Sequence, residues 1–306
     1  MTMRTFWLAS YPKSGNTWFR LLVANLGRTG PIDINTLSED SEIASIRDWF
    51  DRATLLPSAL MTNDEIDRIR PAYHRALGRG GLDRIFDRAG PVADARFVKA
   101  HDAWTMTAGG EPVLGGADAA AGAILIVRDP RAVAPSFAAH TRASIDEAIA
   151  MMADPDASLS FIDDGTARQL RQRLLDWGGH AASWLDQRDI PVHLIRYEDL
   201  HADPGAALHS AMVFAGVPVD PADCAAAACH SAFETLARQE SATGFREATG
   251  DRFFRRGEVA GWRDELTPAQ IARIEADHGA AMQRFGYALV EGRTASSMRG
   301  EGEADG

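Results

Sequence analysis

The stretch TFWLASYPKSGNTW, residues 5–18, decides the fold of this chain. Its first half is an apolar run that predicts a short buried strand. Its second half predicts a tight turn with one lysine, Lys13, and then the first turn of a helix. A strand that leads directly into a helix points unpaired backbone N–H groups and the positive end of the helix dipole at one spot. We therefore expect this spot to bind an anion, most naturally a phosphate.

The turn differs from the common nucleoside-triphosphate loop G-x-x-x-x-G-K-[ST], which needs one glycine directly before the lysine and another five residues before that glycine. Those two positions hold Pro12 and Trp7, and Gly15, the only glycine of the turn, follows the lysine. Ser14 does stand directly after Lys13, as a magnesium-binding hydroxyl would. The stretch alone leaves two interpretations open, an anion-binding loop or a surface turn without a ligand.

The composition is that of an ordinary folded protein with an excess of acidic residues. The chain has 306 residues, of which 45% are hydrophobic and 25% charged, and these values argue against disorder. The 32 basic and 43 acidic residues give a formal charge of -11, which disfavours nucleic acid, anionic polysaccharide and anionic membrane. We expect neither a nucleic-acid nor a membrane partner, and a small neutral or cationic molecule fits this charge better.

The sequence carries no sign of export, disulfide bonding or metal binding. The apolar run before Pro12 is too short for the core of a signal peptide, and no other apolar run approaches the roughly 18 residues of a membrane span. The two cysteines, Cys224 and Cys229, lie in an alanine-rich segment and indicate neither a disulfide framework nor a zinc site. We expect a cytoplasmic protein without a metal, and no pattern indicates its oligomeric state.

Predicted strands and helices alternate along the chain. After the first strand, further strands are predicted over residues 95–101, 123–127 and 191–196. Helices are predicted from Trp18 to Gly27, over 130–141, from Ser144, from Thr166 through Leu185 as one long amphipathic helix, over 204–215 and 221–230, as a short piece around Phe233, and from Thr267. The alternation predicts an α/β, three-layer, P-loop-like fold with a central mostly parallel sheet flanked by helices.

We expect one domain over residues 1–290 and a disordered tail over residues 291–306. Residues 30–92 interrupt the alternation with short helical patterns and no convincing strand, and residues 62–65 form a good capping box. A helical insert between two strands commonly forms a wall or lid over a pocket, although scaffolding is an equally open interpretation.

Cationic and titratable side chains follow three of the predicted strands. Lys13 follows the first, Lys99 and His101 end the second, and Arg128 follows the third. Lys99 and His101 lie two residues apart, so the alternation of a strand places both on the same side. Ligands of open α/β sheets bind outside the carboxyl ends of the strands. The sequence therefore predicts one site at this edge of the sheet.

Two of these segments resemble the PAPS-dependent sulfotransferases, where PAPS is 3′-phosphoadenosine 5′-phosphosulfate. Residues 11–18, YPKSGNTW, are similar to the family's 5′-phosphosulfate loop. Arg128, with Ser136 eight residues later, resembles the family's 3′-phosphate segment, and its guanidinium offers a forked set of donors to a phosphate. Taken alone, Arg128 has the equally good interpretation of capping its strand together with Asp129.

Two further segments continue the resemblance. Residues 253–257, FFRRG, are similar to the family's C-terminal Arg-Lys-Gly loop, with Arg256 in place of the lysine. Without the resemblance this stretch would be interpreted as a solvated basic loop. VKAH, residues 98–101, looks like the family's Lys-Thr-His segment, which bears the catalytic base. Ala100 departs from the usual threonine and Asp102 from the more common apolar residue, so the acceptor pocket stays undefined.

The resemblance implies sulfuryl transfer from PAPS to a phenol or alcohol hydroxyl of a small-molecule acceptor. The second product is 3′,5′-bisphosphoadenosine (PAP), and fixed cations make a metal unnecessary. It implies His101 as general base, Lys13 at the oxygen that bridges sulfur and the 5′-phosphate, and Lys99 beside it. Asn16, where many relatives have threonine, can bind phosphate through its backbone N–H. The residues implied for cofactor binding are Lys13, Ser14, Gly15, Asn16, Thr17, Trp18, Arg128, Ser136, Tyr197, Ser231, Phe233, Arg255, Arg256 and Gly257.

Two other functions are weighed against this one. A P-loop kinase or NTPase would use Ser14 and Asp129 around magnesium, but the loop glycines are missing and a second cationic segment after residue 252 has no purpose there. A non-catalytic nucleotide-binding protein on the same fold would bind the cofactor without turnover. The presence of both Lys13 and His101 argues against that alternative.

Overall fold

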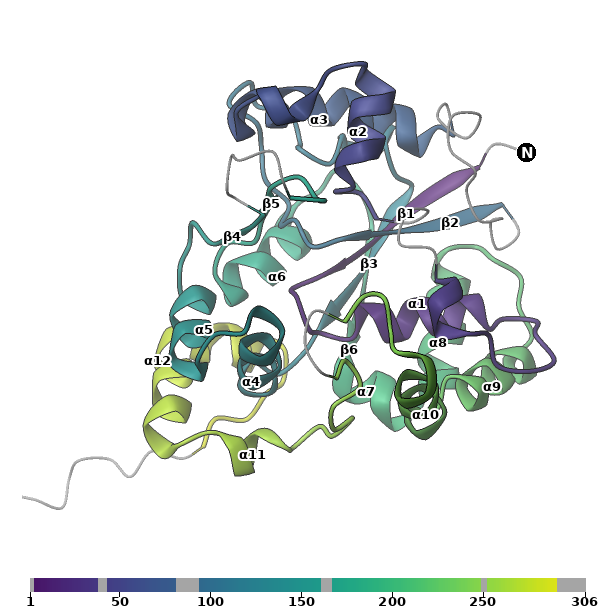
Figure 1. Ribbon diagram of the computed structural model, residues 1–306, viewed down its shortest axis with the longest axis vertical. Helices are drawn as coiled ribbons and strands as arrows, with labels where there is room; N and C mark the ends of the chain where they lie inside the picture. Colours follow the sequence, from purple (N-terminus) through teal and green to yellow (C-terminus); the bar gives the residue numbers. More distant parts are fainter. Residues whose placement is uncertain (1–2, 38–42, 81–93, 161–166, 249–251, 291–306) are drawn as a thin grey trace, which may run out of the picture.

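The computed structural model describes residues 3–37, 43–80, 94–160, 167–248 and 252–290 (Figure 1). Its centre is a parallel four-stranded sheet with the strand order β2-β1-β3-β6. The strands are β1 (Arg4–Ser10), β2 (Ala95–Ala100), β3 (Gly122–Val127) and β6 (Val192–Arg196). They coincide with the four predicted strands, so the prediction of a central parallel sheet is confirmed.

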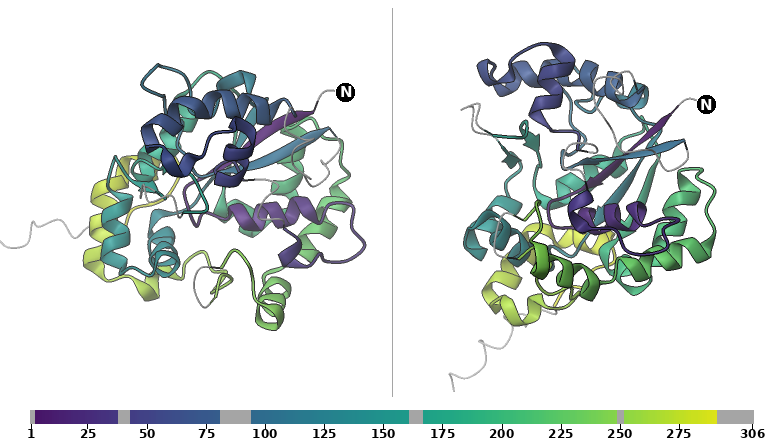
Figure 2. Two further views of the ribbon diagram at one scale, coloured as in Figure 1. Left: turned by 45° about the horizontal axis from the view of Figure 1, so that its top comes forward. Right: turned by 45° about the vertical axis from the view of Figure 1, so that its right-hand side comes forward.

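The sheet is covered on both faces, as expected for parallel strands. Along β1, Trp7 and Ala9 pack into one hydrophobic cluster, whereas Phe6 and Leu8 pack into another. The first cluster includes side chains of α4 (Pro130–Thr141), α5 (Ile145–Met152), α6 (Trp177–Asp186) and α12 (Pro268–Arg284). The second includes side chains of α1 (Asn16–Ala24), α8 (Pro204–Phe214) and α9 (Pro221–His230). Figures 1 and 2 show the resulting three layers, helices on each side of the sheet.

The shorter elements connect these layers. They are the helices α2 (Arg47–Thr54), α3 (Asn63–Gly78), α7 (Tyr197–Ala202), α10 (Phe233–Thr243) and α11 (Trp262–Glu265), the 3₁₀ turns η1 (Ile34–Thr36), η2 (Ser58–Leu60) and η3 (Gly116–Asp118), and the antiparallel pair β4 (Ser158–Leu159) and β5 (Gln172–Arg173). Helix α10 is longer than the short piece expected around Phe233. Among the described residues, no helix is long and apolar enough to cross a membrane.

The described part of the predicted insert is helical. Helix α3 begins at the predicted capping box, where Thr62 Oγ1 accepts from the Glu65 N–H at 3.3 Å. Over residues 30–37 and 43–80 the β-type pairing consists of two isolated bridges, between Ile43 and Lys99 and between Ile46 and Gln169. Residues 38–42 and 81–92 of the insert, and the expected tail over residues 291–306, lie outside the described residues.

The prediction of one long helix from Thr166 is wrong. Helix α6 begins only at Trp177, where the Asp176 carboxylate caps it by accepting from the Gly179 N–H at 2.8 Å. Leu170 and Leu174 are buried as predicted, but their backbone N–H groups donate to carbonyls of other segments. Leu170 and Leu174 belong to one buried face of an extended chain, and a spacing of four residues fits such a face as well as it fits a helix.

Candidate active site

The loop between β1 and α1 has an uncommon backbone. Lys13 has a φ of 67° and Gly15 a φ of 105°, so both residues lie in the left-handed region. A Cβ at Gly15 would also lie 2.7 Å from Cδ2 of the Tyr197 ring. The turn therefore requires a glycine after the lysine, because any side chain there would be strained and would collide with the ring.

Asn16, the first residue of α1, braces this loop against the sheet. Its Nδ2 donates to the Leu8 carbonyl at 2.9 Å and to Ser10 Oγ at 3.2 Å. Ser10 Oγ in turn lies 3.3 Å from His101 Nδ1. The Asn16 Nδ2 group is thus used inside the protein, and its backbone N–H is left for the expected anion.

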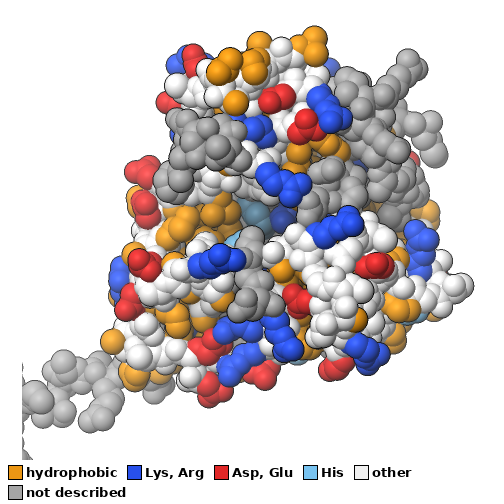
Figure 3. Space-filling view, viewed as in Figure 1, with side chains coloured by type: hydrophobic (Ala, Val, Ile, Leu, Met, Phe, Trp, Pro, Cys, Tyr) orange, Lys and Arg blue, Asp and Glu red, His pale blue; other side chains and the backbone are white. Residues whose placement is uncertain are grey.

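A cavity of about 520 Å³ lies where β1, β2 and β3 end. Histidine and Lys or Arg side chains lie within this hollow in the space-filling view (Figure 3). The predicted site residues that line the cavity are Lys13, Gly15, Asn16, Thr17, Trp18, Lys99, His101, Arg128, Ser136, Tyr197, Phe233, Arg255, Arg256 and Gly257. The fold thus brings together residues that were predicted from segments spread along the whole chain.

Two predicted cofactor-binding residues do not line the cavity. Ser14 is buried, and its Oγ has no hydrogen-bond partner among the residues described. Ser231 is also buried, and its Oγ accepts from Asn25 Nδ2 at 3.0 Å. The Ser231 carbonyl accepts from Trp18 Nε1 at 2.9 Å, so this residue holds the indole in place instead of facing the cavity.

The contacts of His101 define its tautomer. Its Nδ1 lies 2.8 Å from the Ser10 carbonyl, which can only accept a hydrogen bond. Nδ1 therefore carries the proton of the neutral ring, and Nε2 keeps a lone pair. Burial and the nearby Lys99 ammonium hold the pKa of His101 well below its ordinary value. At neutral pH the ring is thus uncharged and able to accept a proton at Nε2.

Lys13 and Lys99 are the only lysines in the chain, and both line the cavity. Lys13 Nζ lies 4.1 Å from the centroid of the Phe253 ring. Burial, with the charges of Lys99 and Arg128, lowers the pKa of Lys13 to about 8. All the other Lys or Arg positions hold arginine. This distribution could have identified Lys13 and Lys99 as special without any motif.

The other predicted cations form two groups. Arg128 Nη1 donates to the Lys13 carbonyl at 3.1 Å, and its guanidinium lies 4.2 Å from the Tyr197 ring centroid. Arg255 and Arg256 are both paired with Glu265, at 2.6 Å and 3.4 Å. The C-terminal basic loop therefore lies at the cavity with its charges partly neutralised.

Glu247 and His140 are among the cavity residues that sequence reasoning missed. Glu247 is in the polar loop after α10, where nothing local distinguishes it from its neighbours. His140 lies on α4 four residues after Ser136, and this spacing places both on one helix face, so it could have been found. Burial, with the charges of Lys13 and Lys99, lowers the pKa of His140 to about 4.

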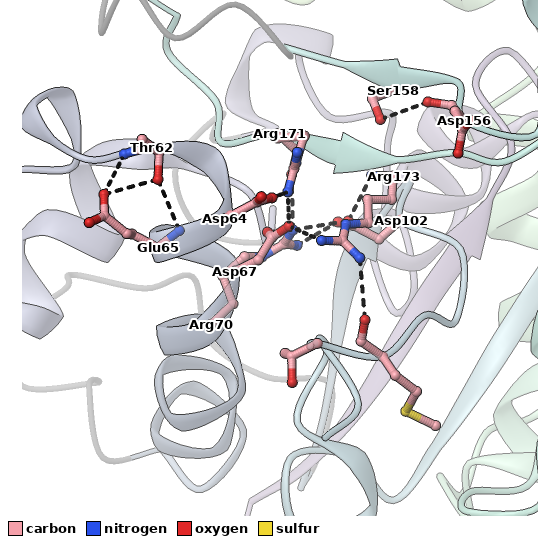
Figure 4. A network of polar contacts seen from close by, with 12 residues as sticks. Thr62, Asp64, Glu65, Asp67, Arg70, Asp102, Asp156, Ser158, Arg171 and Arg173 are labelled. Atoms are coloured by element: carbon pink, nitrogen blue, oxygen red, sulfur yellow. Dashed lines mark hydrogen bonds and ion pairs between the residues drawn. The ribbon is translucent and has the colours of Figure 1, made fainter. Parts of the chain in front are cut away.

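Asp102, directly after His101, anchors a group of charges with a buried centre, which we call the insert network (Figure 4). It consists of Asp64, Asp67, Arg70, Asp102, Arg171 and Arg173. Arg70 of α3 donates from Nη1 and Nη2 to the two Asp102 oxygens at 3.0 Å and 2.6 Å. The Arg173 backbone N–H also donates to Asp102, at 3.0 Å. Asp102 therefore joins the end of β2 to the insert and to β5, which accounts for the carboxylate at this position.

Known proteins match this chain in sequence pattern and in fold. A family model described as "Sulfotransferase domain" matches residues 3–286. The structure of mouse sulfotransferase SULT7A1 complexed with PAP has a TM-score of 0.55 at 18% identity, covering 92% of this chain and 84% of that one. Retinol dehydratase in complex with retinol and PAP has a TM-score of 0.55 at 18% identity, covering 95% and 84%. Its complex with androsterone and PAP has a TM-score of 0.54 at 19% identity, covering 94% and 82%.

At this level of identity, the likeness to the solved structures establishes a shared fold. No curated protein matches the chain.

Proposed function

Because the chain belongs to the sulfotransferase domain family and is a PAPS-dependent sulfotransferase, we propose that His101 is the general base that activates an acceptor hydroxyl. The observation that carries the proposal is the 2.8 Å contact from Nδ1 to the Ser10 carbonyl, which leaves the Nε2 lone pair for the acceptor proton. The acceptor in this proposal is a small hydroxylated molecule. Neighbours of the same fold support this, since their structures hold retinol or androsterone.

The residues present fit a doubly phosphorylated nucleotide. Arg128 lines the cavity, and its Nε is buried without a partner in the described part of the chain, so it has hydrogen-bonding capacity left for a ligand. In our proposal the first turn of α1 with Lys13 holds the 5′ end, and Arg128, Ser136 and the basic loop hold the 3′-phosphate. PAPS supplies the sulfuryl group, and loss of its sulfur–oxygen bond to the 5′-phosphate leaves PAP.

The roles of the two lysines follow from where charge develops. As the acceptor oxygen bonds to sulfur, its proton passes to His101 Nε2, and negative charge builds on the departing phosphate oxygen. Lys13 donates to that oxygen in this proposal, and Lys99 adds a second positive charge beside it. Fixed cations in a buried site stabilise such charge without reorganising at the moment of transfer.

The structure argues against one of the alternatives, a kinase or NTPase. A kinase or NTPase would need Asp129 as a free carboxylate at the end of β3, but this carboxylate accepts from the Arg131 N–H at 2.9 Å and caps α4. It is also paired with the Arg131 guanidinium at 2.7 Å. Asp129 is therefore occupied by structural contacts.

Replacing His101 tests the proposal. His101→Ala should lower the rate of sulfate transfer by about 10²- to 10⁴-fold, the usual contribution of a general base, while PAP binding measured by calorimetry stays near that of the wild type. His209→Ala, on α8 and away from the cavity lining, is the matched control. Turnover at the wild-type rate in His101→Ala would show that another group takes the proton.

A further inference from the structure

Glu247 is bound to three groups that come from two different walls of the cavity. Its Oε1 accepts from Arg20 Nη1 of α1 at 2.6 Å, and its Oε2 accepts from Thr17 Oγ1 at 3.1 Å. The same Oε2 lies 3.9 Å from Lys99 Nζ at the end of β2. We call Thr17, Arg20, Lys99 and Glu247 the donor-side cluster, because Thr17 and Lys99 belong to the proposed PAPS site.

This cluster is buried and carries more positive than negative charge. The side chains of Arg20, Glu247 and Lys99 are 1%, 10% and 14% exposed. Arg20 Nε and Nη2 have no hydrogen-bond partner within the described ranges. One carboxylate thus serves two buried cations, and without it Lys99 and Arg20 would face each other uncompensated.

Besides Glu247, the groups of the described residues that interact electrostatically with Lys99 include two cations and two histidines. These groups are Arg20 of α1, Lys13 of the phosphate loop, His101 at the end of β2 and His140 of α4. Burial lowers the pKa of Lys99, Glu247 opposes this, and Arg20 adds to it. Burial would raise the pKa of Glu247, but Lys99 and Arg20 outweigh it and hold that pKa below its ordinary value. Glu247 is therefore ionised at neutral pH.

We propose that Glu247 is a positioning residue for sulfuryl transfer, whose carboxylate keeps Lys99 protonated and holds its ammonium next to the Thr17 hydroxyl. The proposal rests on the role proposed above for Lys99. A carboxylate cannot itself bind the anionic donor, and its place beside Thr17 costs some attraction for phosphate. What it contributes is a charged lysine at a buried position where a lone amine would lose its proton.

The scarcity of lysine makes the charge of Lys99 directly measurable. Protein labelled with [13Cε]lysine should give side-chain signals from only Lys13 and Lys99, and Lys13→Arg assigns them. In Glu247→Gln, which keeps the shape and removes the charge, the Lys99 signal should titrate at lower pH than in the wild type. Glu247→Asp keeps the charge and should titrate close to the wild type. An unchanged Lys99 titration in folded Glu247→Gln would overturn the inference, whatever the activity.

The pH dependence of the kinetics gives a second test of the role proposed for Glu247. The pH profile of kcat/KM for PAPS reports groups of the free enzyme, so its alkaline limb should move to lower pH by about one unit or more in Glu247→Gln. In a Lys99→Arg background the arginine stays charged, and Glu247→Gln should leave this limb in place. A shifted Lys99 signal with an unmoved limb would uphold the charge-holding role of Glu247 and overturn the catalytic role of Lys99.

Discussion

Two buried arginines of this molecule differ in how completely they are paired. Arg70, in the insert network, donates to both oxygens of Asp102, to Asp67 and to the Arg171 carbonyl. Arg20, in the donor-side cluster, has one carboxylate contact, to Glu247, and two nitrogens without a partner in the described residues. Arg70 therefore has two carboxylate partners and one nitrogen, Nε, without a partner in the described residues, whereas Arg20 has one carboxylate partner and two such nitrogens.

This difference separates the structural task from the functional one. The three arginines of the insert network are balanced by three carboxylates, so this network fixes geometry and serves to attach α3 to the residue after His101. A cluster with surplus positive charge retains attraction for an incoming anion. The comparison therefore predicts that breaking the first costs mainly stability, and that breaking the second changes mainly the charge state of Lys99.

The largest expected effect is on stability, from Asp102→Ala. Removing this carboxylate leaves Arg70 buried with only Asp67 and a carbonyl, and breaking a buried pair in this way costs about 3–5 kcal/mol. Urea unfolding measures the loss. Asp48→Ala removes an exposed pair with Arg52 on α2 and is the control, with an expected cost of about 1 kcal/mol or less. Equal losses for the two variants would mean that the insert network does not hold the fold.

A smaller loss of stability is expected for Arg20→Met. Glu247 keeps Thr17 and Lys99 as partners, so the cost should be about 1–3 kcal/mol, that of one buried acceptor losing a partner. Since Arg20 lowers the pKa of Lys99, its removal should make Lys99 titrate at higher pH, opposite in sign to Glu247→Gln. Arg28→Met, at an exposed position shortly after α1, is the control for both measurements. A Lys99 titration that moves downward would break the comparison between the two clusters.

The sequence predicted those parts of the site that depend on local pattern and on sheet topology. The loop around Lys13 is encoded by a strand, a turn and a helix start within a few residues. Lys99, His101 and Arg128 follow from the rule that parallel strands end at one edge. Each of these positions can be predicted without knowing how distant segments pack.

The partners of the two buried arginines could not be predicted in this way. Arg70 and Asp102 are 32 residues apart, and Arg20 and Glu247 are 227 residues apart. Both pairs form only because the insert and the loop after α10 fold back onto the strand ends, and no periodic pattern specifies that placement. Leu170 shows the reverse case: its spacing from Leu174 predicted a helix, but the structure has an extended chain there.

The smallest expected effect is an acid sensitivity on the insert side. His74 of α3 is buried, and its Nδ1 lies 2.8 Å from the Val113 carbonyl. Burial, with the Arg70 charge, lowers the pKa of His74 to about 3. Below its unfolded pKa of about 6.5 the unfolded chain takes up a proton that the folded chain does not, so stability falls as the pH falls from there toward the folded pKa.

His74→Gln removes this titration and isolates its contribution. Between pH 6.5 and 5.5 the wild type should lose about 1 kcal/mol more of its unfolding free energy than the variant does, as measured by urea unfolding at each pH. His209→Gln, on α8, should keep the wild-type dependence. Because Asp67 and Asp102 hold the Arg70 guanidinium in place, its charge should keep the folded-state pKa of His74 low whether or not PAP is bound. If the pH dependence of the unfolding free energy disappeared on adding PAP, the insert network would respond to the ligand. The division between a structural and a functional cluster would then be wrong.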